Sequence, residues 1–145
     1  MKSTEGAMRR SVSPCLLVES IEAELEFLKT VFNVTVYEGL RPEGTTWPVE
    51  AKLGDTTLKI GRAESNPSPT SSVLYVWTQD LDGTFARAMS AGATLISEPR
   101  QQPGGVREAG FRDPQGQIWW IGDPGKKKSN REVQEMLAKQ RRARL

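Results

Sequence analysis

The residues of this chain that could do chemistry are carboxylates and aromatic rings, because its 145 residues include no histidine and only one cysteine, Cys15. Transition-metal sites in proteins are built from imidazole, thiolate or several carboxylates in a defined geometry. The sequence therefore predicts no metal centre of that type. It also predicts a buried, inert thiol at Cys15, since a cysteine nucleophile normally depends on a nearby base.

Two glutamates are the candidate catalytic bases. Glu50 alternates with Lys52 along one predicted strand, and Glu108 follows Arg107 on the matching strand of the second half of the chain. These side chains could orient a polar ligand or remove a proton from it, or they could be ordinary solvated or ion-paired surface charges. A general base needs a shifted pKa and a substrate proton within reach, and a sequence displays neither. Both interpretations therefore stay open.

Large aromatic side chains recur on the predicted strands, at Trp47, Tyr75, Trp77, Phe111, Trp119 and Trp120. Successive side chains of a strand point to opposite faces, so Trp119 shares a face with Ile121 and Trp120 shares the other face with Ile118. A flat apolar ring on an accessible face would suit a planar ligand. The same ring could instead simply fill space, and both alternatives remain open for Trp120.

The elements that position these residues follow one pattern twice. In the first half, a strand over 12–18 precedes a helix that is capped by Ser20 and ends at Asn33. Three further strands are predicted over 34–37, 47–53 and 57–60.

The second half repeats this order. A strand over 73–77 precedes a helix that is capped by Asp80 and ends at Gly92, and a strand begins at 93–96. A hairpin follows, with strands over 106–112 and 117–121 around an Asp-Pro-Gln-Gly turn.

A repeat of about 60 residues predicts an α+β fold of two βαβββ modules. We place the modules at 10–62 and 72–125, within one domain over 10–125, with a Pro/Ser-rich connection between them. The alternative is an α+β domain without an internal repeat.

The C-terminal segment, residues 126–145, differs from the rest in charge. It carries eight basic and two acidic residues, a net +6, which leaves −4 for the remaining residues because the whole chain carries +2. A capping-box pattern that starts at Ser129 predicts a basic helix with a thin apolar stripe of Val133, Met136 and Leu137. The helix could clamp a partner subunit, approach an anionic surface or remain solvated.

Composition narrows the setting in which the chain works. No apolar run approaches the ~20 residues that span a bilayer, and the first residues have no apolar stretch typical of an export signal. A single cysteine allows no internal disulfide. We expect a cytoplasmic protein with no membrane insertion and no nucleic-acid partner.

Four segments of the chain, in this order, resemble the vicinal oxygen chelate superfamily of glyoxalases, bleomycin-resistance proteins and dioxygenases: PCLLVESIEAELEFLKTVF, EAKLGDTTLKIG, LYVWTQDLDGTFARAMSAGATLISEP and REAGFRDPQGQIWWIGD. The resemblance implies two βαβββ modules whose curled mixed sheets surround a cavity, and chains that pair as homodimers. It also implies that Trp120 faces the cavity and that Trp119 faces the helices.

The resemblance places the usual metal-ligand positions near Ser13, Pro48 or Glu50, Val73 and Trp120. Of these residues only Glu50 is a good ligand, so we expect no metal and no other cofactor.

We therefore expect a metal-free protein of the bleomycin-resistance type that sequesters an aromatic or cationic small molecule in a Trp-lined cavity. The residues expected to bind that ligand are Trp47, Glu50, Tyr75, Trp77, Phe111 and Trp120. The alternative is a glyoxalase-like lyase or isomerase that uses Glu50 or Glu108 as its base. Whether the chain is an enzyme stays open, although the loss of the family's metal ligands favours a binding protein. An interaction module that works through the basic tail is a third reading.

Overall fold

The computed structural model describes residues 11–37, 48–63, 71–125 and 130–143. The chain divides into two compact units. The first comprises residues 1–72 together with the turn at 114–117, and the second comprises residues 73–113 and 118–145. The two units are described in turn.

The first unit is a helix packed on a four-stranded sheet. Its elements are β1 (Cys15–Val18), α2 (Ile21–Phe32), β2 (Thr35–Tyr37), β3 (Val49–Leu53) and β4 (Thr56–Arg62). The strand order is β1-β4-β3-β2, with β1 parallel to β4 and the other pairs antiparallel. Helix α2 joins β1 to β2, which run parallel to each other, because a tight turn can join only antiparallel strands. Since β2 and β4 are both antiparallel to β3, β4 also runs parallel to β1.

Helix α2 begins and ends where local chemistry dictates. The Ser20 hydroxyl accepts a hydrogen bond from the Ala23 backbone N–H at 3.1 Å, and Asn33 ends the helix in the left-handed region at φ 55°. The helix buries Leu25 and Leu28 against one face of the sheet, where Leu16 and Ile60 are also buried. The other face of this sheet, on which Cys15 and Lys52 are exposed, is called its open face below.

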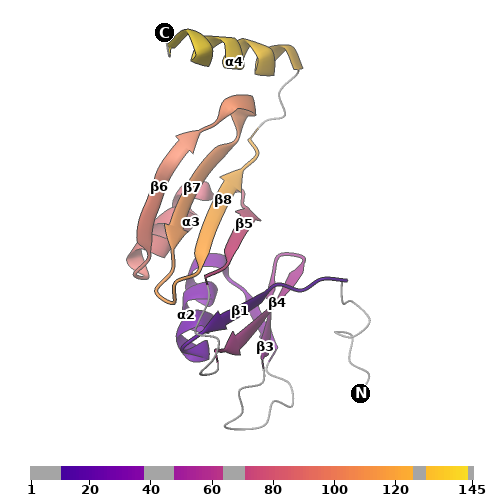
Figure 1. The fold of residues 1–145 in the computed structure, drawn as a ribbon, viewed down its shortest axis with the longest axis vertical. Helices are drawn as coiled ribbons and strands as arrows, with labels where there is room; N and C mark the ends of the chain where they lie inside the picture. The colour runs from indigo at the N-terminus through magenta and orange to yellow at the C-terminus, as the bar shows by residue number, and fades with distance from the viewer. Residues whose placement is uncertain (1–10, 38–47, 64–70, 126–129, 144–145) are drawn as a thin grey trace. The chain divides into compact units, whose positions relative to one another are not determined.

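The second unit repeats the pattern. Its elements are β5 (Val73–Trp77), α3 (Leu81–Ser90), β6 (Thr94–Gln101), the 3-10 turn η1 (Pro103–Gly105), β7 (Arg107–Arg112), β8 (Ile118–Asp123) and α4 (Asn130–Ala143). The strand order is β5-β8-β7-β6, the counterpart of the first sheet, with β5 parallel to β8 (Figure 1).

Helix α3 is capped by Asp80, whose Oδ1 accepts from the Gly83 backbone N–H at 3.1 Å. It buries Leu81 and Ala88 beside Trp119 and Phe111 of the sheet, and these two aromatic residues are fully buried. Trp119 also donates a hydrogen bond from Nε1 to Asp113 Oδ2 at 2.9 Å, which satisfies the only polar group of the indole. The prediction that Trp119 belongs to the core is confirmed.

The predicted fold class is confirmed: the chain is α+β and consists of two βαβββ repeats. The two sheets are not closed. In the second sheet the exposed residues Val73, Tyr75 and Trp77 lie on the face opposite α3, which we call its open face. Strand β6 is longer than the strand predicted at 93–96: it continues from Thr94 through Pro99 to Gln101. A proline is tolerated there because β6 is the edge strand of its sheet.

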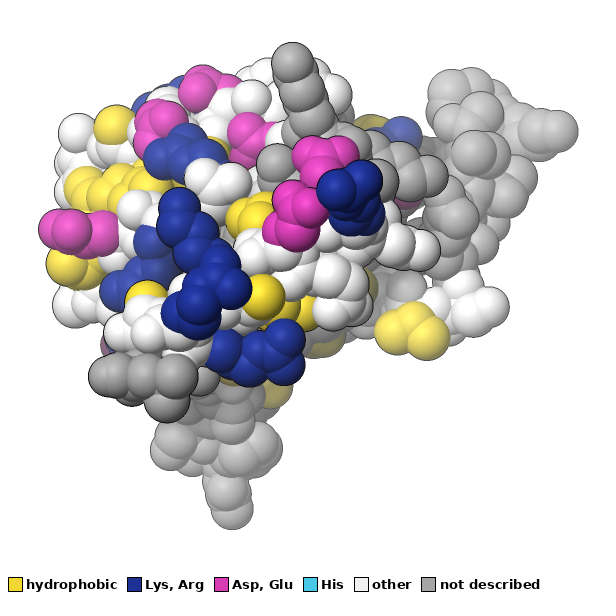
Figure 2. Space-filling view, turned by 90° about the horizontal axis from the view of Figure 1, so that it is seen from above, with side chains coloured by type: hydrophobic (Ala, Val, Ile, Leu, Met, Phe, Trp, Pro, Cys, Tyr) yellow, Lys and Arg dark blue, Asp and Glu magenta, His cyan; other side chains and the backbone are white. Residues whose placement is uncertain are grey.

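The basic tail does contain a helix, α4, and none of its residues is fully buried. Its apolar stripe of Val133, Met136 and Leu137 is half-buried. Lys and Arg side chains are prominent on the face of the molecule seen in Figure 2. None of the helices in the described residues is long and apolar enough to cross a membrane.

Candidate functional site

The open face of the second sheet brings together four of the residues singled out in the sequence: Tyr75, Trp77, Glu108 and Trp120. Strand register sets them in rows that run across β5, β8, β7 and β6. One row reads Trp77, Gly122, Glu108 and Arg100; the next reads Tyr75, Trp120, Gly110 and Ser97. We call these eight residues the aromatic face.

Two glycines let the aromatic rings lie against the sheet. A Cβ on Gly110 would stand 2.9 Å from Cε3 and Cζ3 of Trp120, well inside the ordinary carbon–carbon contact distance. A Cβ on Gly122 would collide with the hydroxyl of Tyr75. Trp120 therefore lies over Gly110 and Tyr75 lies over Gly122, which any larger residue at either position would prevent.

Tyr75 reaches across β8 to a carboxylate on β7. Its hydroxyl donates a hydrogen bond to Glu108 Oε2 at 2.7 Å. Desolvation of the phenol, then this hydrogen bond and the negative charge of Glu108, raise the pKa of Tyr75 well above its ordinary value of 10.0. The phenol is therefore a neutral donor throughout the physiological pH range, and it fixes the direction of one Glu108 oxygen.

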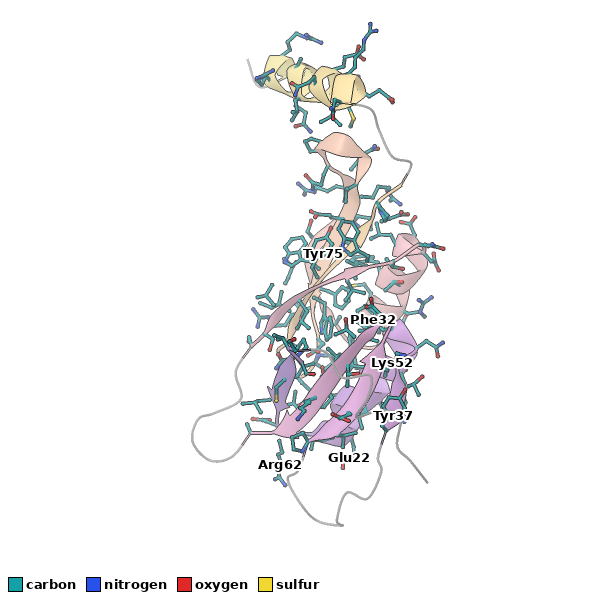
Figure 3. All side chains as sticks on the ribbon, turned by 90° about the vertical axis from the view of Figure 1, so that its right-hand side faces the viewer. Glu22, Phe32, Tyr37, Lys52, Arg62 and Tyr75 are labelled. Atoms are coloured by element: carbon teal, nitrogen blue, oxygen red, sulfur yellow. The ribbon has the colours of Figure 1, made fainter. Side chains whose placement is uncertain are left out.

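The aromatic face is exposed in spite of its apolar character. Trp77 is 60% exposed and Tyr75 is 42% exposed, and their ring centroids lie 4.9 Å apart with the planes tilted by 55°. Val73, on the same side of β5, is 67% exposed. Tyr75 is labelled in Figure 3 on the second unit. A group of large apolar side chains left in contact with water is typical of a surface that binds something.

The open face of the first sheet is polar. One row across β1, β4, β3 and β2 reads Cys15, Lys59, Glu50 and Tyr37. Lys52 lies in a neighbouring row, and Tyr37 and Lys52 are labelled in Figure 3. Glu50 therefore shares an open face with Lys52, as the alternation predicted.

The expectation of a buried thiol at Cys15 is wrong, because Cys15 is exposed. The physical reason is strand alternation: Leu16 and Val18 occupy the covered face of β1, which turns Cys15 to the open face.

Phe111 was expected to bind the ligand, but the structure places it elsewhere. It pairs in register with Trp119, is 0% exposed and belongs to the face covered by α3. Arg107 also turns to that side, where its guanidinium binds the Asp82 carboxylate at 2.9 and 3.1 Å. This hydrogen bond and the positive charge of Arg107 lower the pKa of Asp82.

The predicted ligand residues are thus only partly brought together. Tyr75, Trp77 and Trp120 share the aromatic face with Glu108, whereas Glu50 belongs to the other unit. Trp47 lies outside the described residues. Sequence reasoning missed Arg100 and the two glycines; a glycine within a strand is the one signal that could have indicated close approach of another group.

The donor set does not fit the family's metal site. Of the residues at the implied positions, Ser13 and Glu50 offer oxygen, whereas Val73 and Trp120 offer no lone pair suited to a divalent cation. Within the described parts of the chain, no three His, Cys, Asp or Glu side chains are grouped so that they could hold a metal ion.

Comparison with known proteins identifies a family model and a relative that each match most of the chain. The family model described as Glyoxalase/Bleomycin resistance protein/Dioxygenase superfamily matches residues 11–121. An uncharacterized protein of Mycobacterium bovis is 24% identical over 145 residues, covering 90% of this chain and 93% of that protein.

Two solved structures have a similar fold. TioX from Micromonospora sp. ML1 is 21% identical with a TM-score of 0.64, over 78% of this chain and 98% of TioX. The fosfomycin resistance protein FosX from Mesorhizobium loti is 16% identical with a TM-score of 0.61, over 86% of this chain and 96% of FosX. At this level of identity the likeness concerns the fold alone.

Proposed function

The chain belongs to the Glyoxalase/Bleomycin resistance protein/Dioxygenase superfamily, and we propose that it is a metal-independent binding protein for a planar aromatic small molecule. The ligand lies on the aromatic face of the second sheet. The observation that carries this proposal is the exposure of Tyr75 and Trp77 beside Trp120 on one open face. Loss of the family's metal ligands is consistent with binding rather than metal-assisted chemistry.

The energy available from stacking limits how the ligand is held. One base-like ring stacked on an aromatic side chain contributes ~1–3 kcal/mol, whereas a micromolar dissociation constant corresponds to about −8 kcal/mol. Trp120 alone therefore cannot hold the ligand. Tyr75, Trp77 and polar contacts to Glu108 must contribute, and Trp47 remains a candidate beyond the described residues.

A ligand that is cationic throughout is less well supported than an aromatic one. Glu108, a carboxylate on the open face of the second sheet, already accepts a hydrogen bond from Tyr75. This face also carries Arg100 opposite Glu108, and Arg112 four residues beyond Glu108 along β7. Two arginines therefore share this face with Glu108, so a lone cation would gain little there.

Oligomeric state and location complete the proposal. We infer a homodimer, as the family resemblance implies. A partner subunit or the ligand would cover the exposed apolar side chains of Val73 and Trp77. A cytoplasmic location is consistent with the single cysteine, which allows no internal disulfide.

Native mass spectrometry with a library of planar aromatic metabolites tests the proposal, followed by calorimetric titration of the compounds that bind. We expect Trp120→Ala to weaken binding by about 10-fold or more, since about 1.4 kcal/mol is a factor of ten. Tyr37→Ala, on the polar open face of the first sheet, is the matched control and should leave affinity unchanged. Equal loss in both variants, or no loss in either, would place binding elsewhere.

A lyase or isomerase that uses a glutamate base is the second candidate. The Tyr75–Glu108 hydrogen bond favours Glu108 over Glu50 for this role, because it fixes the carboxylate beside the aromatic rings. Incubation of bound compounds in deuterium oxide tests it by NMR. Enzyme-dependent exchange of a carbon-bound proton that is lost in Glu108→Gln and kept in Glu50→Gln supports catalysis, whereas unchanged exchange in Glu108→Gln excludes Glu108 as the base.

A further inference from the structure

A charged pair of opposite sign stands at one end of the aromatic face. Glu108 on β7 and Arg100 on β6 are direct partners in the antiparallel register. Their Cβ atoms are therefore about 4.5–5.5 Å apart and their side chains rise from the same face of the sheet. Trp120 lies over Gly110, which is the next residue of β7 on the same face of the sheet as Glu108.

The two groups are not satisfied by each other. Ion pairs of other arginines, Arg87, Arg107 and Arg131, are formed with Asp80, Asp82 and Glu135 and include neither Arg100 nor Glu108. Within the described parts of the chain, the Arg100 side chain makes no hydrogen bond or ion pair, and the Glu108 side chain accepts one hydrogen bond, from Tyr75. An ionised carboxylate has about four acceptor sites, so Glu108 can accept at least one more hydrogen bond.

We propose that the polar edge of the aromatic ligand carries a hydrogen-bond donor and an acceptor side by side, as a lactam or cyclic amide does. Glu108 accepts from the N–H of that edge, and Arg100 donates to its carbonyl oxygen. This inference rests on the proposed function, and it assigns the ligand class and a specificity residue, Arg100, to the same face.

Spacing and chemistry both support this class. Residues two apart on a strand are separated by about 6.6–6.8 Å, so a ring stacked on Trp120 above Gly110 brings its edge to Glu108. A lactam places N–H and C=O on adjacent atoms, which matches a carboxylate and a guanidinium on opposed residues of neighbouring strands. A lone ammonium would meet Arg100, and a lone carboxylate would meet Glu108, so each would face one repulsive charge.

Isothermal titration calorimetry with two probes tests the proposal: isoquinolin-1(2H)-one and its N-methyl derivative. The two share a ring system and a carbonyl, and the second lacks the N–H donor. We expect the lactam to bind the wild-type protein about 10-fold or more tightly than the N-methyl compound, because only the lactam can donate a hydrogen bond to the Glu108 carboxylate. Hydrogen bonds to charged groups are roughly twice as strong as neutral ones.

The variants separate recognition from folding. Glu108→Leu removes the acceptor at similar volume and should bring the ratio of the two affinities close to one. Arg100→Gln should weaken both probes by about 5-fold or more, since both keep the carbonyl, and Arg112→Gln on the same face is its control.

Each result decides between explanations. Equal binding of both probes that still depends on Trp120 would overturn the lactam inference and leave the proposed function intact. An unchanged affinity in Arg100→Gln would also overturn it, and would make Arg100 an ordinary charge on an edge strand. Binding of neither probe would contradict the inference, while hits from the wider aromatic library would still support the proposed function.

Discussion

Substitution of Gly110 by alanine should displace Trp120 and thereby weaken both the fold and ligand binding. The added Cβ would lie 2.9 Å from two ring carbons of Trp120 and 3.0 Å from Cδ2. Carbon atoms in contact prefer about 3.5–4.0 Å, so the ring must lift by roughly 0.5–1 Å. The backbone at Gly110 is held on both sides by β6 and β8, so the indole moves rather than the strand.

The size of the effect follows from two opposing terms. Overpacking of this kind typically costs ~1–3 kcal/mol, and the reduced entropy of the unfolded chain on changing Gly to Ala returns ~0.4–1 kcal/mol. We expect a net loss of roughly 0.5–2 kcal/mol in the free energy of unfolding. Trp120 is only half-buried, so part of the strain is relieved by outward movement of the ring, and affinity should suffer more than stability.

Urea unfolding followed by circular dichroism measures the stability term, and calorimetric titration measures the binding term. Gly61→Ala is the matched control, because Gly61 lies on β4 and a Cβ there would meet Leu17 at 3.4 Å and Pro48 at 3.8 Å. These are close to ordinary contacts, so the control should be nearly neutral. If Gly110→Ala matches Gly61→Ala in both assays, Trp120 does not lie over Gly110 and the argument fails.

Three further outcomes are expected. In a spectrophotometric pH titration, Tyr75 should ionise well above pH 10, and Glu108→Gln should lower its pKa. Because the pKa of Tyr75 is raised in the folded state, the free energy of unfolding should fall as pH rises above about 10. A titration in which no tyrosine ionises well above pH 10 would refute the Tyr75–Glu108 hydrogen bond. Asp113→Ala should cost ~1–3 kcal/mol in thermal or urea unfolding, because it leaves the buried Trp119 N–H without its acceptor, and a change below about 0.5 kcal/mol would contradict that. Removal of residues 126–145 should leave the circular dichroism spectrum of a folded αβ protein, since α4 has no fully buried residue; an unfolded spectrum would show that the tail belongs to the core.

Features fixed by neighbours in sequence could be predicted well. The caps at Ser20 and Asp80 and the stop at Asn33 depend on contacts within one turn of the chain, and the structure has all three. The opposite faces of Trp119 and Trp120 follow from alternation along a single strand. These rules need no knowledge of the partner strand.

Features fixed by the partner strand could not be predicted. Alternation relates Phe111 to Ala109, but only the register with Trp119 says that both lie on the covered face. The pairing of Arg100 with Glu108 is less accessible still, because irregular register in β6 lies between Leu95 and Arg100. A bulge changes the phase of a strand, so period-2 counting across it gives the wrong face.

The central claim is that a planar aromatic ligand binds on the aromatic face, and NMR of the tryptophan indole N–H groups tests it most directly. The chain has four tryptophans, which give four indole N–H signals. Titration with isoquinolin-1(2H)-one should shift the signals of Trp77 and Trp120, assigned by single substitutions. The signal of Trp119, which is buried and bound to Asp113, should stay unchanged. No shift at Trp77 and Trp120, with this probe and with every aromatic compound that binds, would contradict the account.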